Sequence, residues 1–517
     1  MNLKANLLNL FKNKPVSESQ FILGIDLGDL ASSICYYDPL RKTSEIIDIS
    51  GGYGRANMPT TLQYTGEVGE WIFGENAILN DPTGEDISFT NILNNLGNPS
   101  YAQIGDTLRP NTYILGLYIR ELLRGVKNIN PKAEIIGIIV SVPDYIKDST
   151  LAELTDAFTE AGCAESLIGF IPQRECALSY HFNERKADRE NLLLVDFGGR
   201  ELRAGIYRIA GGRDHVKADL LSYFYDNDLS AGAVDKSIYN KFAEIYEQHT
   251  GEAADKAAPR IGTLFYQNKD ALFQRHIPAK GMRVFYNFYH PPFYHVFTKE
   301  EAGDIIKPFK SGAVSFFERL FKDSKEAVEY GDISTVLCTG GGFEMLWARE
   351  LIEDLFPDSN IHTHKNPKAV NAYGAAVIAA GKLGLESGKP VKIEDSLQTK
   401  KDIGIIIESE GEKVFMPLSQ SGSFWRQAVK PLKLLIRDMP EGEYELKIHE
   451  RDSAGYMTNI GSVLLEGLPP SRVAAYISLS LSYVDSQTVK VRAGDLGFGK
   501  FFPASGAYGE GTFKVSG

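Results

Sequence analysis

Apolar residues form the same strand–turn–strand pattern twice in the first half of the chain. One copy, FILGIDLGDLASSICYYD, occupies residues 21–38, and the other, LLLVDFGGRELRAGIYRI, occupies residues 192–209. In each copy an apolar strand ends in aspartate, a glycine turn follows, and a second alternating strand returns. A third glycine run, VLCTGGGFEM, occupies residues 336–345. The repetition predicts a duplicated fold whose turns bring backbone N–H groups close to an anion.

Segments with helical spacing of apolar residues alternate with these strands. They cover residues 107–128, 149–162, 233–249, 298–322, about 344–356 and 365–381. The continuous apolar run at residues 134–146 is typical of a strand that is buried on both faces. Strands that alternate with helices, twice over, predict an α/β body.

The pattern changes near residues 385–402, which are polar, contain Pro390 and are predicted to form a linker. Residues 403–517 have almost no helical spacing and contain a series of short strand-like runs separated by turns. Such a series predicts an all-β sandwich. The predicted organisation is therefore an N-terminal extension at 1–20, an α/β body at 21–384, the linker, and the all-β domain.

The composition is that of a globular protein with several domains. The formal net charge of −12 argues against a broad nucleic-acid-binding surface, which needs a basic excess. The four cysteines show no Cys-x-x-Cys spacing, which predicts buried free thiols in a reducing cytoplasm and no zinc site. No apolar run is long enough to cross a bilayer. Residues 3–12 are interpreted as part of a frayed extension, with a short amphipathic helix on a membrane or partner as the alternative.

In their order along the chain, the motifs of the body resemble those of the actin-like ATPase superfold and of the DnaK-type seventy-kilodalton heat-shock chaperones. The matching segments are GIDLGDLASS, VSVPDYI, CALSY, VDFGGRELRAGIY, CTGGGFEML and NPKAVNAYGAAVIAAG. DIGIIIESEGEKVFMPLSQSGSF and GSVLLEGLPPSRVAAYISLSLSYVDSQTVKVRA are similar to the family's peptide-binding β-sandwich. The resemblance implies a duplicated actin-like (ribonuclease H-like) two-lobed nucleotide-binding body followed by an all-β sandwich domain.

The resemblance also implies a site for ATP or ADP and for Mg²⁺. Asp26 and Asp196 match the two carboxylates that orient hydrated Mg²⁺ in the family, and they are the candidates for catalytic and, through water, metal-binding roles. The alternative is that each aspartate only caps the turn that follows it. The other nucleotide-binding candidates belong to the three glycine loops and are Gly28, Gly198, Gly199, Arg200, Gly340, Gly341 and Gly342.

Both phosphate loops depart from the family pattern. Asp29 and Leu30 stand where the family has two hydroxyl residues. Arg200, Glu201 and Arg203 stand where it has glycine, threonine and aspartate. A carboxylate at position 29 within about 4 Å of a phosphate charge would repel it by roughly 1 kcal/mol in water and about 4 kcal/mol near a protein surface. The two arginines can offset this repulsion, because guanidinium groups pair well with phosphate oxygens.

The residues that would perform hydrolysis are also missing. The family's catalytic glutamate falls near Pro172, with Glu175 close by but out of register. Residues 89–97, where the family has its catalytic lysine, contain none. Glu344 stands where an arginine stacks on adenine in the family. Because phosphoryl transfer depends on positioning and charge stabilisation, these losses predict slow or absent turnover.

In the β domain, Phe415, Met416, Phe424 and Trp425 are the candidates for binding extended apolar peptide segments, since the resembled family lines its peptide groove in this region. Methionine and aromatic side chains suit such adaptable recognition. The alternative is that these side chains fill the core of the sandwich. The chain stops at Gly517, where the family's helical lid would follow, so a lidless binder is expected.

We therefore expect a cytoplasmic, chaperone-like protein that binds ATP or ADP with slow or absent hydrolysis and binds peptide or protein segments. One alternative is a non-catalytic pseudo-ATPase scaffold that no longer binds nucleotide, which the departures in the loops favour. A small-molecule kinase or a filament-forming actin relative is a further alternative, although the β domain counts against both.

Overall fold

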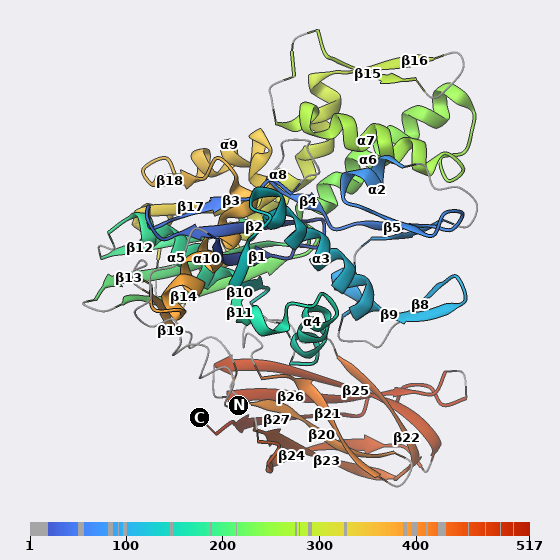
Figure 1. Cartoon of the computed structure of the whole chain (residues 1–517). Helices are drawn as coiled ribbons and strands as arrows, with labels where there is room; N and C mark the ends of the chain where they lie inside the picture. The colour runs from blue at the N-terminus through green and yellow to red at the C-terminus, as the bar shows by residue number, and fades with distance from the viewer. Residues whose placement is uncertain are drawn as a thin grey trace. The chain divides into compact units, whose positions relative to one another are not determined.

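The computed structural model consists of two compact units, residues 1–394 and residues 395–517, each of which is described by itself (Figure 1). The structure describes residues 19–516 apart from 50–55, 81–85, 91, 97–100, 145, 147, 187–188, 213–214, 275–276, 279, 288–291, 325–327, 386–389, 395–398, 400, 410–411, 422–430, 453, 471, 486–487 and 500. The predicted contact segment 3–12 and two predicted peptide-binding residues, Phe424 and Trp425, lie outside the described residues.

The first sheet contains the first predicted hairpin. Its strands are β1 (Gln20–Asp26), β2 (Ala31–Asp38), β3 (Thr43–Ile46), β4 (Met58–Pro59), β10 (Glu134–Val142) and β11 (Leu167–Pro172). β1 and β2 are antiparallel neighbours at its centre, with β3 antiparallel to β2 and β4 also paired with β2. On the other side, β10 runs parallel to β1, and β11 runs parallel to β10. The predicted buried strand at 134–146 is thus β10, which has a parallel neighbour on each edge.

The second sheet repeats this order around the second predicted hairpin. Its strands are β12 (Glu190–Phe197), β13 (Leu202–Gly211), β14 (Val216–Asp226), β17 (Thr335–Thr339), β18 (Asn360–Thr363) and β19 (Val391–Glu394). β12 and β13 form the antiparallel hairpin and β14 follows β13, while β17 and β18 run parallel to β12 on its other side. The shared strand order of the two sheets, β11-β10-β1-β2-β3 and β18-β17-β12-β13-β14, shows the predicted duplication in the topology.

The longer helices of the described residues confirm the α/β class, and all except those at residues 173–184 and 258–273 follow a predicted segment closely. They are α3 (Asn111–Ile129), α4 (Asp148–Glu160), α5 (Gln173–Glu184), α6 (Ala231–Thr250), α7 (Ala258–Phe273), α8 (Lys299–Lys322), α9 (Leu346–Leu355) and α10 (Val370–Lys382). The apolar face of α3 is fully buried and contains Leu115, Tyr118, Ile119 and Leu122. This helix begins later than predicted, because residues 107–110 pair with an adjacent strand instead.

Short elements complete the body. They are β5 (Leu62–Thr65), β6 (Glu70–Phe73), α2 (Glu75–Leu79), β7 (Ile87–Phe89), η1 (Ile92–Asn95), β8 (Tyr101–Ile104), β9 (Thr107–Pro110), η2 (Ala164–Ser166), β15 (Met282–Tyr286), β16 (Phe293–Phe297), η3 (Tyr330–Asp332), η4 (Gly341–Glu344) and η5 (Pro367–Ala369). No helix among the described residues is long and apolar enough to span a membrane. Three of the four cysteines are buried, all four are free, and burial raises the pKa of each thiol.

Small residues let α10 pack directly on the first sheet and on α5. A Cβ on Gly24 of β1 would lie 2.1 Å from the carbonyl oxygen of Ala372, and one on Gly374 would lie 1.8 Å from the carbonyl oxygen of Cys176. Each of these glycines therefore allows a backbone-to-backbone approach that any side chain would prevent. This packing holds the start of α10 beside the first glycine turn.

The second unit is a single antiparallel sheet around its own core. Its strands, in the order β21-β20-β23-β24-β27-β26-β25-β22, are β20 (Asp402–Ser409), β21 (Glu412–Ser419), β22 (Leu432–Met439), β23 (Gly442–Arg451), β24 (Met457–Leu468), β25 (Arg472–Asp485), β26 (Thr488–Gly497) and β27 (Tyr508–Lys514). The all-β prediction is confirmed, and the described strands are hydrogen-bonded in one continuous, barrel-like order. Register irregularities in β23–β24 and β25–β26 allow long strands to bend around the core.

The predicted linker at 385–402 is partly structured. Its residues 391–394 form β19, which pairs parallel with β14 in the second sheet. Lys217 and Glu394 add an ion pair between these two strands, with 2.8 Å between Nζ and Oε2. The polar composition concealed this strand, because only Val391 of the four residues is buried. An edge strand needs backbone pairing more than it needs apolar side chains.

Gly24→Ala is expected to destabilise the protein, because the added Cβ would meet Ala372 O at 2.1 Å and Ala376 N at 2.2 Å, both of them backbone atoms. Overpacking a core costs about 1–3 kcal/mol, and a lower midpoint of urea unfolding would measure the loss. Gly169→Ala on β11 is the matched control, since nothing lies within 4 Å of its added Cβ. Equal midpoints for the two variants would contradict the close approach of α10.

Candidate functional site

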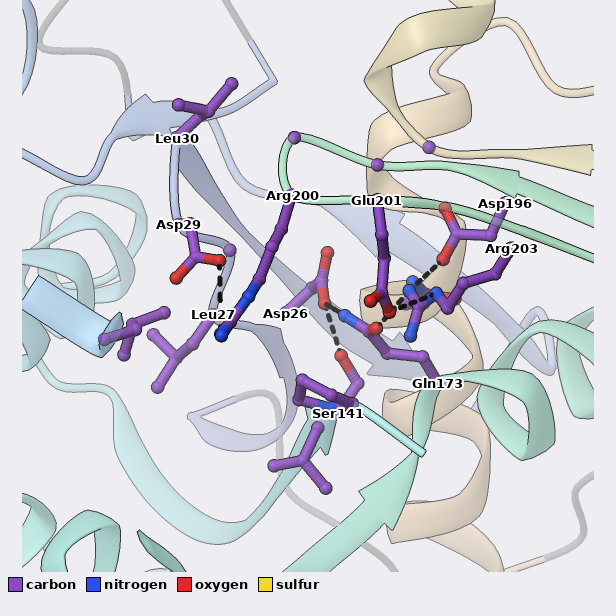
Figure 2. A pocket seen from close by; sticks show the side chains of 18 of the residues that line it. Asp26, Leu27, Asp29, Leu30, Ser141, Gln173, Asp196, Arg200, Glu201 and Arg203 are labelled. Carbon is purple, nitrogen blue, oxygen red and sulfur yellow. Dashed lines mark hydrogen bonds and ion pairs between the residues drawn. The ribbon is translucent and has the colours of Figure 1, made fainter. Parts of the chain in front are cut away.

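Asp26 is the last residue of β1, directly before the first glycine turn, and it is buried. The parallel register sets Asp26 opposite Ser141 of β10, and the Ser141 hydroxyl donates to Asp26 Oδ1 over 2.5 Å. Gln173, the first residue of α5, donates from Nε2 to the same oxygen over 2.9 Å (Figure 2). Lys368 Nζ lies 3.9 Å from the other carboxylate oxygen. The carboxylate is therefore surrounded by donors from three separate segments.

Lys368 is a site residue that the sequence reasoning missed. It reaches the cleft from η5, directly before α10. A Cβ on Gly28 would lie only 2.6 Å from Lys368 Nζ, so the missing side chain at position 28 makes room for the ammonium group. Residues 89–97, where the resembled family has its lysine, instead contribute Leu93 and Leu96 to the lining. In the sequence, Lys368 could have been recognised as a site residue because it stands in NPKA, at the start of the predicted closing helix.

The second glycine turn places Asp196 beside an arginine. In the antiparallel hairpin, Asp196 of β12 lies directly opposite Arg203 of β13, and Arg203 Nη2 donates to Asp196 Oδ2. Arg203 Nε also lies 3.3 Å from Glu201 Oε1, and Nη2 donates to Gln173 Oε1 over 2.5 Å. Burial by itself would lower the pKa of Arg203. The neighbouring Asp196, Tyr223 and Glu201 have a larger, opposite effect, so the pKa is raised well above its usual value.

The two phosphate loops contact each other across the cleft. Arg200 Nη1 lies 3.9 Å from Asp29 Oδ2 (Figure 2). The Leu30 side chain lies against Gly199, where a Cβ would come within 2.7 Å of Leu30 Cγ. The departures at positions 29, 30 and 200 are therefore complementary. Asp29 and Arg200 attract each other by charge, and Leu30 packs against the space that Gly199 leaves.

The third glycine loop is shaped by its packing on β12. Gly340 has φ of 89°, and its Cβ would lie 2.4 Å from Asp196 Oδ1. A Cβ on Gly342 would lie 2.3 Å from the Phe197 ring. Gly341 has open space toward the cleft, with no neighbour of its Cβ position closer than 3.5 Å. Glycine is thus required sterically at 340 and 342, and only Gly341 leaves room for a ligand.

The loops enclose a cavity of about 460 Å³, a size usual for small-molecule sites. Its lining includes all the predicted nucleotide-binding residues except Gly342, and adds Ser141, Gln173 and Lys368. Glu344 is not among the lining residues; burial raises its pKa. Four carboxylates and three cations line the cavity, and each cation lies 3.9 Å or less from a carboxylate oxygen. The cleft therefore has no positive excess with which to attract a polyanion.

A hydrated Mg²⁺ does not fit between Asp26 and Asp196 as these side chains lie. Mg²⁺ demands octahedral oxygen ligands and usually keeps several waters. Arg203 contacts Oδ2 of Asp196, while Gln173 and Lys368 contact the two oxygens of Asp26. Among the described residues, no group of three or more His, Cys, Asp and Glu side chains is arranged to hold a metal ion. The metal role predicted for the two aspartates is at odds with their contacts.

The described peptide-binding candidates lie on opposite faces of β21. Met416 packs against the core of the second unit with Leu418. Phe415 points to the other face, where Arg451 covers its ring with 4.4 Å between the guanidinium carbon and the ring centroid. The two side chains do not form one surface, because neighbours on a strand alternate in direction. Of the two, Phe415 is the one on the outer face.

Comparisons with known proteins match both units. Residues 44–248 match a family described as "Family of unknown function (DUF5716) C-terminal", and residues 398–515 match "Domain of unknown function (DUF8552)". "Chaperone protein DnaK" of Thermosipho melanesiensis is 23% identical over 94% of this chain and 80% of its own length. The protein of the same name from Thermosipho africanus is 22% identical over 94% and 79%. "Chaperone protein dnaK1" of Synechocystis is 25% identical over 70% of this chain and 51% of its own length.

Asp29→Asn is expected to stabilise the protein at neutral pH. Burial raises the pKa of Asp29 from 3.8, although Arg200, Lys368 and Arg203 oppose the shift. A raised folded-state pKa means that the ionised carboxylate lowers stability above that pKa and has no such effect below its ordinary pKa. The gain in the midpoint of urea unfolding should therefore be present at pH 7 and disappear below about pH 4.

Asp106→Asn, which replaces an exposed carboxylate in the turn between β8 and β9, is the control and should show neither effect. A lower midpoint for Asp29→Asn than for the unaltered protein at pH 7 would mean that the ion pair with Arg200 outweighs the cost of burial.

Proposed function

We propose that this chain, a divergent relative of the DnaK-type heat-shock chaperones, is a chaperone-like protein that binds protein segments and does not hydrolyse ATP. The proposed lack of ATP hydrolysis rests on the presence of a glutamine, Gln173, in the cleft. This amide contacts Asp26 at the junction of β11 and α5, beside the Pro172 that stands near the family's catalytic glutamate.

An amide in this place cannot act as a general base. Both ends of the Gln173 side chain are also engaged, since Nε2 donates to Asp26 and Oε1 accepts from Arg203. Glu175 is not among the residues that line the cavity, and burial raises its pKa despite Lys382 and Arg174 nearby. Activation of an attacking water therefore lacks a carboxylate among the described lining residues at this junction.

Binding of ATP or ADP without turnover is a second candidate function. The cavity volume and the open space at Gly341 favour it, and Arg200 and Lys368 are cations that can pair with phosphate oxygens. A phosphate group that paired with Arg200 would compete with Asp29, whose Oδ2 lies 3.9 Å from Arg200 Nη1. The self-paired charges make this the less favoured of the two candidates.

The second unit supports the protein-binding half of the proposal. β21 lies at one edge of the described sheet, and an edge strand offers backbone groups to an extended segment. Phe415 on its outer face adds an aromatic surface beside Arg451. Aromatic and arginine side chains are enriched where binding energy concentrates. We therefore infer that a client segment contacts this face.

The full chain should release no phosphate from Mg-ATP above the level of a reaction without protein, since Gln173 stands at the β11–α5 junction in place of a carboxylate base and the contacts of Asp26 and Asp196 oppose a metal ion. Radiolabelled ATP gives the needed sensitivity, and Asp196→Asn is the matched variant. Phosphate release that this variant abolishes would contradict the proposal. Calorimetric titration of ATP into the same preparation then decides between the two candidates, because heat of binding without turnover would favour the second.

Phe415→Ala is expected to weaken the binding of an unfolded client by about 1 kcal/mol or more. Fluorescence anisotropy with labelled, carboxymethylated α-lactalbumin measures the affinity. Val414→Ala removes an exposed apolar side chain from the same strand on its other face and serves as the matched control. Equal affinities for the two variants, or no binding by the unaltered chain, would contradict a client surface at Phe415.

A further inference from the structure

Arg203 lies where it links the two halves of the cleft. Its Nη2 group donates both to Asp196 Oδ2 and to Gln173 Oε1 (Figure 2). Gln173 in turn donates from Nε2 to Asp26 Oδ1 over 2.9 Å. A continuous chain of contacts therefore runs from Asp26 at the end of β1 in the first sheet to Asp196 near the end of β12 in the second.

This series of contacts joins the same two carboxylates, Asp26 and Asp196, that a hydrated divalent cation between them would join. A Mg²⁺ ion between two carboxylates holds them through its positive charge and through ordered waters that donate hydrogen bonds. Here the guanidinium of Arg203 supplies the positive charge at Asp196, and the amide of Gln173 supplies the donor at Asp26. Arginine stays protonated in proteins and its planar donors suit carboxylates, so this cation cannot dissociate.

The remaining charges agree with this interpretation. The side chain of Arg203 is 8% exposed, and a second carboxylate, Glu201, lies 3.3 Å from its Nε. A divalent cation added beside this guanidinium would meet a like charge at short range in a partly desolvated site. Each aspartate thus contacts a donor from the protein itself, and the positive charge of Arg203 opposes the entry of a metal ion.

We propose that Arg203 is a built-in cation that takes the place of a divalent metal between Asp26 and Asp196. The two sheets are joined through Gln173 and Arg203 without metal. This inference concerns the cleft alone and stands whether or not the second unit binds a client.

The test is a titration with Mn²⁺, whose free ion is counted by electron paramagnetic resonance. The unaltered full chain should bind no Mn²⁺ in the cleft. Arg203→Gln keeps a hydrogen-bonding side chain but removes the charge, and it should gain saturable binding of a single Mn²⁺ per chain. Arg203→Lys keeps the charge and should gain none. Arg200→Gln, which removes a 57% exposed arginine from the same turn, is the matched control and should gain none.

Circular dichroism establishes that each variant is folded. Two results would overturn the proposal: Mn²⁺ binding by the unaltered chain that Asp196→Asn abolishes, or a folded Arg203→Gln without any gain. Gln173→Ala provides a test if Arg203→Gln does not fold. This variant removes the contacts of Gln173 with Asp26 and Arg203 but keeps the guanidinium of Arg203. This variant should still bind no Mn²⁺, and binding would show that Arg203 is not what excludes the metal.

Discussion

The buried guanidinium of Arg203 is the interaction on which the arrangement of the cleft depends. Hairpin register places it opposite Asp196, and Gln173 extends its contact to Asp26. Because the arginine remains charged, each acceptor around it is needed to offset the cost of burying that charge. Charge pairing within the chain therefore links the two glycine turns across the cleft.

Steric constraints on the packing of α10 determine where Lys368 lies. Gly24 and Gly374 allow α10 to approach β1 and α5 at backbone distance, and Lys368 lies directly before that helix. Gly28 then leaves the space that the ammonium group occupies beside Asp26. The glycines of this fold thus meet steric requirements of the packing. Several of them are required because helices, strands and one lysine approach too closely for any side chain.

The resemblance to the DnaK-type chaperones is confirmed by the comparisons, whereas the roles that it implied for the site residues remain predictions. The α/β class, the duplicated sheet order and the all-β second unit agree with the sequence-based predictions. The metal role of the two aspartates conflicts with their contacts, and the peptide-binding pair Phe415 and Met416 is divided between two faces of one strand. A fold can therefore persist while the side chains within its cleft are exchanged for a different set of interactions.

The sequence by itself determined the features that depend on neighbouring residues. Strand periodicity, the aspartate at each strand end and the glycine turns are local patterns, so the two hairpins and the loops of the cleft could be predicted. The pairing of Asp29 with Arg200, the bridge through Gln173 and the arrival of Lys368 beside Asp26 join residues far apart in the chain. Only the tertiary structure decided these contacts, because they arise from how the sheets and α10 pack. They convert a pattern that resembles a metal–nucleotide site into a cleft whose charges are paired by the chain itself.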